Sequence, residues 1–431
     1  MDRKILAQMV GALLRWSALD RLGTRTVRKE VRKIVEGLET VDDARAGAIA
    51  RAKRAILEEM GTYLERQGAA GAGGSAAEDA RALTSGLVRS EVVKDKRLRT
   101  RQGEGVRIVV KGRVSTIGLT PRVRRLLGDR MQLEQLKATQ RRTDELLQQY
   151  AALEAENSRA GTEAGPALQR KLRKGFEETT RKLAAQEWLD KVQALWTGLE
   201  YRDGKLAIEY INEAIALVPD YPVYVFYRGN ANYYLRQDAL AIRDYTQAIE
   251  LDGRFAAAFN NRGNVHYRLE DYSKAIADYD QAVRLRADYG DALNNRANTF
   301  YKLGQQEAAL RDYERALGVD ADNPLYYNNR AITYDDMGDT ERALADYGRA
   351  IALDPELATA YCNRGRTQAT RGDPRAAIAD FNLAIRHDRR HAQAYHERGN
   401  AYQTLGNKGA ARRDWRKAAK LGHRAASGAA R

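Results

Sequence analysis

The stretch "NNRGNVHYRLEDYSKAIADYDQAVRL", residues 260–285, decides the fold because related stretches return along the chain at a fixed interval. Each copy has a small residue at the position of Gly263, and consecutive copies lie 34 residues apart: Gly229, Gly263, Ala297, Ala331, Gly365 and Gly399. An alanine further on keeps the same step, at Ala248, Ala282, Ala316, Ala350, Ala384 and Ala418. Each copy reads as two amphipathic helical halves around a turn. A strict period of this length therefore predicts stacked helix pairs.

The physics of stacking explains which residues recur. Two short amphipathic helices cannot bury their apolar faces alone, so each pair must pack on its neighbours. Small residues mark the places where backbones approach closely, and aromatic residues fill the space between turns. One aromatic recurs in each second helix: Tyr245, Tyr279, Tyr313, Tyr347, Phe381 and Trp415. We therefore assign most of the tyrosines and alanines to the architecture.

These features resemble the tetratricopeptide repeat family, which has paired helices of this period. An earlier and degenerate copy covers residues 188–221, with Leu195 where a small residue belongs, so seven repeats cover residues 188–425. The resemblance implies a mainly α chain whose C-terminal half is a right-handed α-solenoid with a concave groove. It also implies a protein or peptide partner in that groove.

Asparagines flank the small position in the first helix of most repeats, where the family presents its groove. An amide both donates and accepts, so a row of them can pair with the backbone of an extended peptide, or it can join neighbouring helices. The arrangement resembles the asparagine ladder of the repeats in O-linked N-acetylglucosamine transferases, and we expect only the binding part of that comparison to carry over. The candidate groove residues are Asn230, Asn260, Asn261, Asn264, Asn294, Asn295, Asn298, Asn328, Asn329 and Asn363.

Tyrosines follow one turn later and give the candidate groove an aromatic wall. Tyr233, Tyr267 and Tyr301 either line the groove or pack the repeats. Asp335 and Asp336 take the matching places in the fifth repeat, so the groove would become acidic along its length and suit a ligand with a basic end.

An arginine precedes the small residue in every full copy, where the family usually has an apolar residue. The row is Arg228, Arg262, Arg296, Arg330, Arg364 and Arg398. It can bind phosphates or carboxylates, or each arginine can bond the aspartate that recurs in the second helix of its own repeat. Because the arginines and aspartates recur together, the second reading is favoured.

Charge is unevenly distributed along the chain. Residues 1–200 contain 39 Lys and Arg against 27 Asp and Glu, and residues 89–130 contain 13 against four. This excess predicts an anionic partner, either nucleic acid or an acidic surface. No aromatic residue lies in residues 89–130, so base stacking is not expected. The candidate contacts are Lys94, Lys96, Arg97, Arg99, Arg101, Lys111, Arg113, Arg122, Arg124 and Arg125.

The first half divides into segments by composition. We expect a helical segment over residues 1–66, a Gly/Ala-rich linker over 67–88, a basic segment over 89–130, a helical or coiled-coil arm over 131–187, and a tail over 426–431. Residues 106–119 read as a hairpin of two short strands around Lys111 and Gly112. Residues 131–157 have a few heptads and suggest a homodimer. The apolar stripe within residues 5–16 is expected to pack on neighbouring helices rather than on a membrane.

No motif of a known catalytic or metal site is present. The sequence has no HExxH, GxSxG or paired CxxC, and Cys362 is the single cysteine, which fits a cytoplasmic protein and an inert thiol. We therefore expect a non-enzymatic scaffold without cofactor or metal. One alternative is a nucleic-acid-associated protein whose basic region binds DNA or RNA and whose repeats recruit other proteins. Another is an enzyme with its site within residues 1–187.

Overall fold

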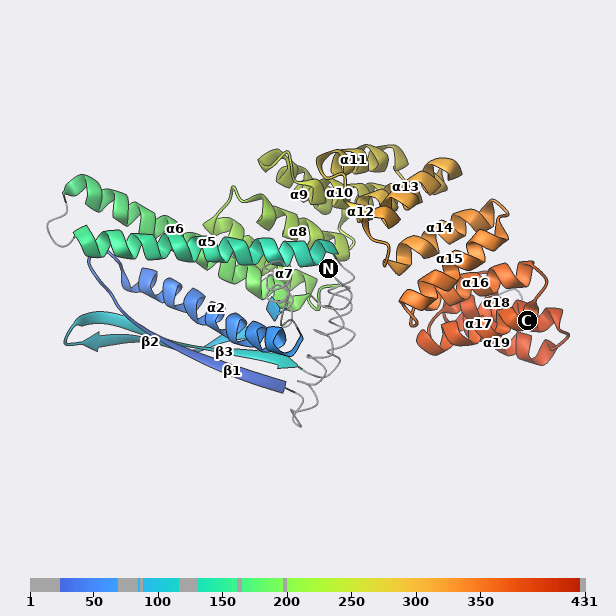
Figure 1. Ribbon diagram of the computed structural model, residues 1–431, viewed down its shortest axis with the longest axis horizontal. Coiled ribbons are helices and arrows are strands. Elements are labelled where there is room, and N and C mark those ends of the chain that lie inside the picture. Colours follow the sequence, from blue (N-terminus) through green and yellow to red (C-terminus); the bar gives the residue numbers. More distant parts are fainter. Residues whose placement is uncertain are drawn as a thin grey trace. The chain divides into compact units, whose positions relative to one another are not determined.

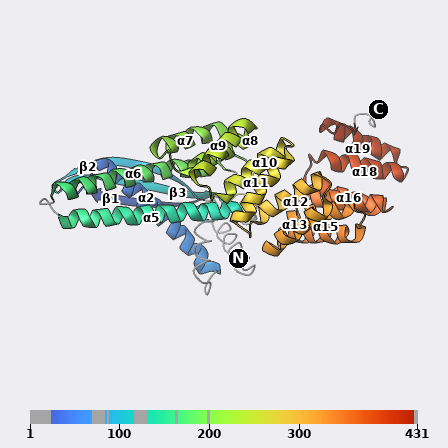
Figure 2. The ribbon, with the colours of Figure 1, turned by 90° about the horizontal axis from the view of Figure 1, so that it is seen from above.

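The computed structural model describes residues 24–68, 84–85, 88–115, 130–160, 165–196 and 200–426. The chain forms two compact units, Met1–Gly253 and Arg254–Arg431. Helix pairs occupy both units, and a small antiparallel sheet lies in the first (Figures 1 and 2). The expected mainly α chain with a solenoid of helix pairs and a basic hairpin is confirmed. In the described part of the chain, no helix combines the length and apolar character needed to cross a membrane.

Among the described residues, the sheet of the first unit has three strands in the order β1-β3-β2. They are β1 (Thr24–Ile34), β2 (Arg89–Thr100) and β3 (Gly103–Ser115), and both pairings are antiparallel. Val106, Ile108 and Val110 are buried on one face of the central strand, which α2 (Val41–Gly68) covers. Because side chains alternate along a strand, Arg107 and Lys111 project from the opposite face.

The predicted hairpin exists, but its turn was placed wrongly. β3 runs straight through Lys111 and Gly112, and the chain reverses between β2 and β3. Gly112 is needed for packing rather than for a turn, because an added Cβ would lie 2.4 Å from Cγ2 of Ile56 on α2. Gly103, with φ of +129°, is the glycine that stands at the reversal.

Of the predicted helical segment over residues 1–66, the described residues are helical only from residue 41 onward. Residues 24–34 form β1 instead, since Val27 and Val31 alternate with charged residues and face α2. Parts of the predicted linker, the tail after residue 426 and the apolar stripe within residues 5–16 lie outside the described residues.

The predicted helical arm is two long helices that pack within the unit. α5 (Arg130–Ala160) and α6 (Pro166–Leu195) contact each other, and α6 also contacts α2. Leu146 and Tyr150 of α5 share a core cluster with Phe176 of α6. The rings of Tyr150 and Phe176 pack edge to face, with their centroids 5.6 Å apart. The heptad pattern thus serves the chain's own core, and a homodimer through residues 131–157 stays a prediction.

Thr40 and Asp43 cap the first turn of α2. The Thr40 amide donates to the Asp43 carboxylate at 2.9 Å, and the Asp43 amide donates to the Thr40 hydroxyl oxygen at 3.2 Å, which forms a capping box. Arg173 and Thr180 of α6 donate to the same carboxylate at 2.6 and 2.8 Å. Asp43, only 2% exposed, therefore joins α2 to α6.

The repeats begin at the end of α6, which pairs with α7 (Gly204–Leu217), followed by α8 (Pro222–Tyr234) with α9 (Asp238–Leu251). The described residues of the second unit form five pairs. They are α10 (Ala256–Arg268) with α11 (Tyr272–Leu285), α12 (Gly290–Lys302) with α13 (Gln306–Val319), α14 (Pro324–Asp336) with α15 (Thr340–Leu353), α16 (Ala358–Thr370) with α17 (Pro374–His387), and α18 (Ala392–Thr404) with α19 (Lys408–Lys420).

Each repeat is closed by an aromatic ring against a small residue. An added Cβ on Gly263 would lie 2.7 Å from the Tyr279 ring, and one on Gly365 would lie 2.8 Å from the Phe381 ring. The alanine that follows the aromatic, such as Ala282, is completely buried. The sequence is therefore periodic because the same contacts recur between the two helices of each pair.

The recurring arginine forms an ion pair with the recurring aspartate of its own repeat, as the co-recurrence predicted. All six pairs are made at 2.6 to 3.0 Å: Arg228–Asp244, Arg262–Asp278, Arg296–Asp312, Arg330–Asp346, Arg364–Asp380 and Arg398–Asp414. The aspartates are buried, and Arg296 also reaches Asp280 of the preceding helix at 2.6 Å. We call these pairs the Arg–Asp clamps.

We expect Arg296→Met to destabilise the third and fourth repeats by about 3 kcal/mol, because it leaves the buried Asp312 carboxylate without its main partner. Amide hydrogen exchange over α12 and α13 measures the change locally, which suits a repeat array better than one global transition. Arg315→Met is the matched control, since Arg315 bonds the same carboxylate at 3.3 Å from a more exposed position and should cost little. Equal exchange rates in both variants would contradict a structural role for the clamp.

We expect Asp43→Asn to destabilise α2 at neutral pH by about 2 kcal/mol, and we expect this loss of stability to be smaller in acid. Burial by itself raises the pKa of the Asp43 carboxyl, but hydrogen bonds from Thr40, Thr180 and Arg173 outweigh it and hold the pKa below its ordinary value of 3.8. A lowered folded-state pKa contributes stability above the ordinary pKa, and this stability is lost as the pH falls through the folded-state pKa.

Hydrogen exchange over α2 at neutral and acidic pH checks this, with Asp42→Asn as control because Asp42 is exposed and weakly paired to Arg97 at 3.5 Å. A difference between Asp43→Asn and the parent chain that persists unchanged in acid would refute the role given to the carboxylate.

Candidate functional site

The candidate groove residues lie on the first helices of successive repeats, as predicted. In the second unit they occupy α10, α12, α14 and α16. Asn230 and Tyr233 lie on α8 of the first unit and are described apart from the rest. The asparagines of the second unit fall into two groups with different hydrogen bonds, which the sequence did not separate.

Seven asparagines form a continuous chain of side-chain hydrogen bonds, which we call the asparagine ladder. Asn363 donates to Asn328, Asn328 to Asn329, Asn329 to Asn294, Asn294 to Asn295, Asn295 to Asn260, and Asn260 to Asn261, at 3.0 to 3.4 Å. Every second step crosses from one repeat to the preceding one. Asn260, Asn294 and Asn328 are buried, so the ladder joins neighbouring helices.

Asn264 and Asn298 form the second group, the outer asparagines. The Oδ1 atom of Asn264 accepts from the Tyr279 hydroxyl at 2.8 Å and also from the Nδ2 group of Asn295 in the ladder at 3.1 Å, and that of Asn298 accepts from Tyr313 at 2.6 Å. Both residues are half-buried, and within the described residues neither Nδ2 group donates to a protein acceptor. Because the bonded Oδ1 fixes the orientation of each amide, the two groups remain as oriented donors one repeat apart.

The pairing of tyrosine with asparagine recurs wherever the aromatic carries a polar atom, with one exception. Tyr245 donates to Asn230 at 2.8 Å, and Trp415 donates to Asn400 at 3.0 Å. In the fifth repeat the matching position is Ile332, and the buried Tyr347 hydroxyl has no hydrogen-bond partner among the described residues. Aligning the repeats would have found this exception.

The predicted tyrosines and aspartates take different roles. Tyr267 is half-buried, with its ring 5.6 Å from that of Tyr272, and burial raises the pKa of its hydroxyl. The Tyr301 hydroxyl donates to Asp336; burial and this bond raise its pKa to about 12. Asp335 is half-buried and Asp336 is exposed. The sequence placed these residues on one row, and the structure joins Tyr301 to Asp336 across adjacent repeats.

The predicted basic contacts divide between two faces of the sheet. Lys94, Lys96, Lys111 and Arg113 lie on the face opposite α2, as the strand register shows. Arg97 and Arg99 lie on the face of α2, where Arg97 pairs with Asp42 and Arg99 lies 3.7 Å from Glu104. Arg101 stands at the reversal between β2 and β3. Arg122, Arg124 and Arg125 lie outside the described residues.

Strand β1 contributes residues that the charge count did not single out. Arg28 and Arg32 register with Lys111 and Arg107 on the same face as Lys94. Glu30 lies among them, and hydrogen bonds from Arg107 and Arg32 lower the pKa of its carboxyl to about 2. Period-two alternation in residues 24–34 was the signal that would have found them.

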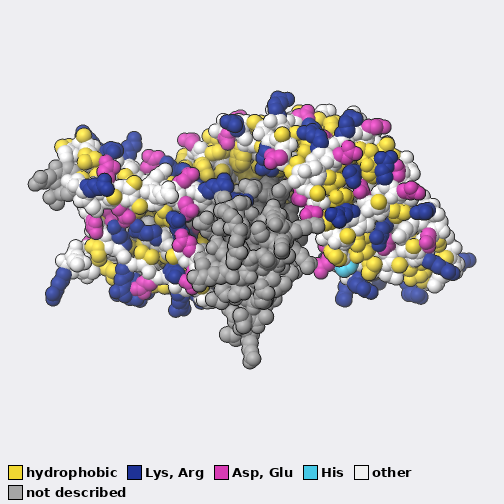
Figure 3. Space-filling model, in the orientation of Figure 1, with side chains coloured by type: hydrophobic (Ala, Val, Ile, Leu, Met, Phe, Trp, Pro, Cys, Tyr) yellow, Lys and Arg dark blue, Asp and Glu magenta, His cyan; other side chains and the backbone are white. Residues whose placement is uncertain are grey.

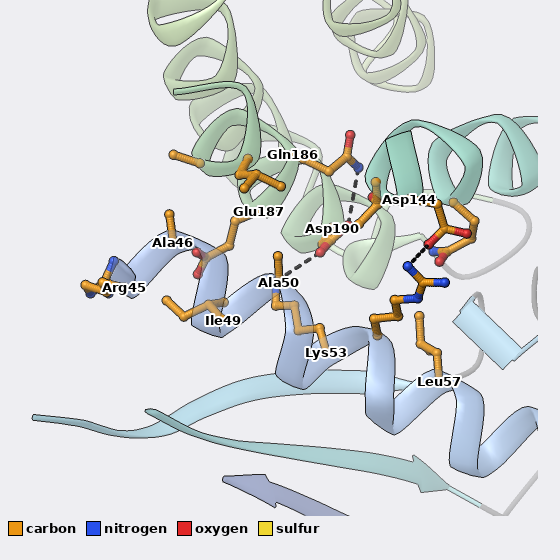
Figure 4. A pocket seen from close by; sticks show the side chains of 15 residues that line it. Arg45, Ala46, Ile49, Ala50, Lys53, Leu57, Asp144, Gln186, Glu187 and Asp190 are labelled. Carbon is orange, nitrogen blue, oxygen red and sulfur yellow. Dashed lines mark hydrogen bonds and ion pairs between the residues drawn. The ribbon is translucent and has the colours of Figure 1, made fainter. Parts of the chain in front are cut away.

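A small pocket between α2, α5 and α6 is lined by Ile49, Leu183 and several charged residues (Figure 4). Two ion pairs join the charged residues of this lining: Lys53 contacts Asp190 at 2.9 Å, and Arg54 contacts Asp144 at 3.3 Å. Burial lowers the pKa of Lys53, but Asp190 and Glu187 outweigh it, so the net pKa is raised and the ammonium stays charged. The pocket therefore has the character of a helix interface.

Cys362 is buried, and burial raises the pKa of its thiol to about 12. A thiol held protonated at neutral pH is a poor nucleophile. No group of three metal-ligating side chains occurs in the portion of the chain that is described.

Comparison with protein families supports the assignment of the repeats. Tetratricopeptide repeat models match residues 254–322, 334–372, 358–391 and 392–421. No curated protein is similar to this chain.

Two of the solved structures similar to this chain are tetratricopeptide repeat proteins, both less than 25% identical to it. One is YrrB, described as having an unusual peptide-binding site, at 24% identity over 44% of this chain and 97% of that one, with a TM-score of 0.35. A tetratricopeptide repeat protein of Parabacteroides merdae matches at 19% identity over 57% of this chain and 97% of that one, with a TM-score of 0.48. The family models, which match most of residues 254–421, identify this part of the chain as tetratricopeptide repeats, whose arrays are typically non-enzymatic scaffolds for protein interaction.

Proposed function

We propose that the chain is a non-enzymatic adaptor whose repeats bind an extended segment of a protein partner along α10, α12 and α14. The observation that carries the proposal is the pair of outer asparagines, Asn264 and Asn298, whose Nδ2 donors are held in one orientation at the repeat spacing. An extended peptide presents backbone carbonyls at regular intervals, so fixed donors can bind it with little dependence on its sequence.

The neighbouring side chains support the same surface. Tyr267 and Tyr301 follow the outer asparagines by one helical turn on the same two helices. Asp335 and Asp336 end the next first helix, where within the described residues neither forms an ion pair with Lys or Arg. The surface thus offers amide donors and phenol rings first and carboxylates next, which suits a segment that carries a basic residue toward one end.

The asparagine ladder is not part of the proposed binding surface. The five amides between its two ends already donate to one ladder member and accept from another, so we assign the ladder to holding the repeats in register rather than to the ligand. Only the outer asparagines are assigned direct contact with the partner.

A second candidate function is favoured by the charge of the first unit. The basic residues of β1, β2 and β3 support a contact with an anionic partner, so the chain would join that partner to the one bound by its repeats. In the nucleic-acid-associated version of this function the basic contact is primary and the repeats recruit other proteins.

We expect the double variant Asn264→Asp and Asn298→Asp to weaken peptide binding about tenfold, because it removes two hydrogen-bond donors and keeps the Oδ1 acceptors for Tyr279 and Tyr313. The probe is a set of uncharged peptides selected from a random display library on the full chain, with affinity measured by calorimetry. Uncharged peptides limit the effect of the new carboxylates.

Two variants serve as controls. Asn400→Asp removes the donor of a comparable asparagine that already bonds Glu397 at 3.1 Å in the last repeat, and should leave affinity unchanged. Asn329→Asp interrupts the ladder, and should lower stability more than affinity. If the double variant binds the selected peptides as the parent chain does, the outer asparagines do not hold the partner.

A further inference from the structure

The face of the sheet opposite α2 carries a strip of cations contributed by all three strands. We call it the basic face, and its members are Arg28, Arg32, Arg89, Lys94, Lys96, Arg107, Lys111 and Arg113. Lys and Arg side chains line the lower left margin of the space-filling view, where the sheet lies (Figure 3). The strip is set by register: Arg28 lies opposite Lys111, which lies opposite Glu91, and Lys96 lies opposite Arg107.

Acidic residues neutralise only part of this face. Glu30 accepts from Arg32 at 2.7 Å and from Arg107 at 2.8 and 2.9 Å, and Glu91 pairs with Arg113. The other five cations form no ion pair with a carboxylate in the described part of the chain: Arg28, Arg89, Lys94, Lys96 and Lys111. Like charges gathered on one face repel one another, so an anion that binds there relieves the repulsion as well as adding its own attraction.

The strip is long and narrow. Outer strands of a three-stranded sheet lie about 10 Å apart, and Arg107 and Arg113 are separated by about 20 Å along β3. Neighbouring strands also twist by about 20°, so the face is a saddle rather than a plane. A rod-shaped polyanion that follows the strip can meet cations of all three strands, whereas a flat membrane would meet the raised corners only.

The uncharged side chains of the face also narrow the choice of partner. Val109 and Leu98 are half-buried, and Val93 at the β2 bulge is 43% exposed but has only a short side chain, so these residues offer no long apolar group to insert into a bilayer. The described part of the sheet contains no aromatic side chain, so bases cannot be stacked. Arginine and lysine contact phosphates without reading sequence.

We propose that the basic face binds the phosphate backbone of double-stranded nucleic acid independently of its sequence. This inference rests on the anionic contact in the proposed function and names its surface and its partner. It adds β1 to the basic segment, and it assigns the contact to one face only, so Arg97 and Arg99 take no part.

The test compares two double variants of the full chain that remove the same charge from the same strand. Lys94→Ala with Lys96→Ala alters the basic face, and Arg97→Ala with Arg99→Ala alters the opposite face. Binding to labelled duplex DNA and duplex RNA of mixed sequence is followed by fluorescence anisotropy over a salt series. Vesicles of phosphatidylglycerol and phosphatidylcholine provide the membrane arm.

We expect the parent chain to bind duplexes with an affinity that falls steeply with salt. The Lys94/Lys96 variant should reduce the slope of log K against log salt by about two, since each phosphate contact contributes about 0.9. The Arg97/Arg99 variant should leave the slope nearly unchanged, and affinity should not depend on the duplex sequence.

Equal loss in both double variants would overturn the assignment to one face. Binding to anionic vesicles without binding to duplexes would overturn the choice of nucleic acid. The peptides selected on the repeats should bind the Lys94/Lys96 variant normally, so failure of this inference and failure of the peptide-binding proposal give different results.

Discussion

The solenoid depends on an ion pair that is repeated once per helix pair. Each Arg–Asp clamp joins the first helix of a repeat to the second beside the place where an aromatic ring packs on glycine or alanine. A buried carboxylate tolerates the loss of water only when its oxygens are bonded, and the bidentate geometry of arginine meets that need. The clamp therefore fixes the distance and rotation of the two helices more closely than apolar packing alone would. This explains an arginine at a position that is usually apolar in the family.

The asparagine ladder acts between repeats as the clamp acts within them. An amide is well suited to this, because a residue that both donates and accepts can pass a hydrogen bond in one direction through several repeats. The ladder ends where the sequence changes, since Cys362 takes the place of the buried asparagine and the following repeat has His396 and Glu397. Interrupting a buried series of hydrogen bonds leaves polar groups unpaired and costs free energy. The ladder therefore favours one register between repeats.

The sequence predicted the parts of the structure that repeat and missed the parts that occur once. The period fixed the helix pairs, and the joint recurrence of Arg262 with Asp278 and its equivalents correctly favoured the clamp. By contrast, a strand such as β1 is defined by pairing with residues about 80 positions away, and its charged side chains masked its alternation. Gly112 was misread for the same reason, because its role depends on Ile56 of a distant helix.

The two groups of asparagines show which property of a site the sequence does not predict. Asn261 and Asn264 are three residues apart on α10 and look equivalent. Asn261 accepts the last bond of the ladder, whereas Asn264 accepts from both Tyr279 and Asn295. Which side chain keeps a donor available is decided by the partner that reaches it from the second helix, and that partner is 15 residues further along the chain. The same argument applies to the fifth repeat, where Ile332 leaves Tyr347 without its acceptor. A binding surface built on a repeat is therefore defined by which members keep an unbonded polar group, and not by the repeated residue itself.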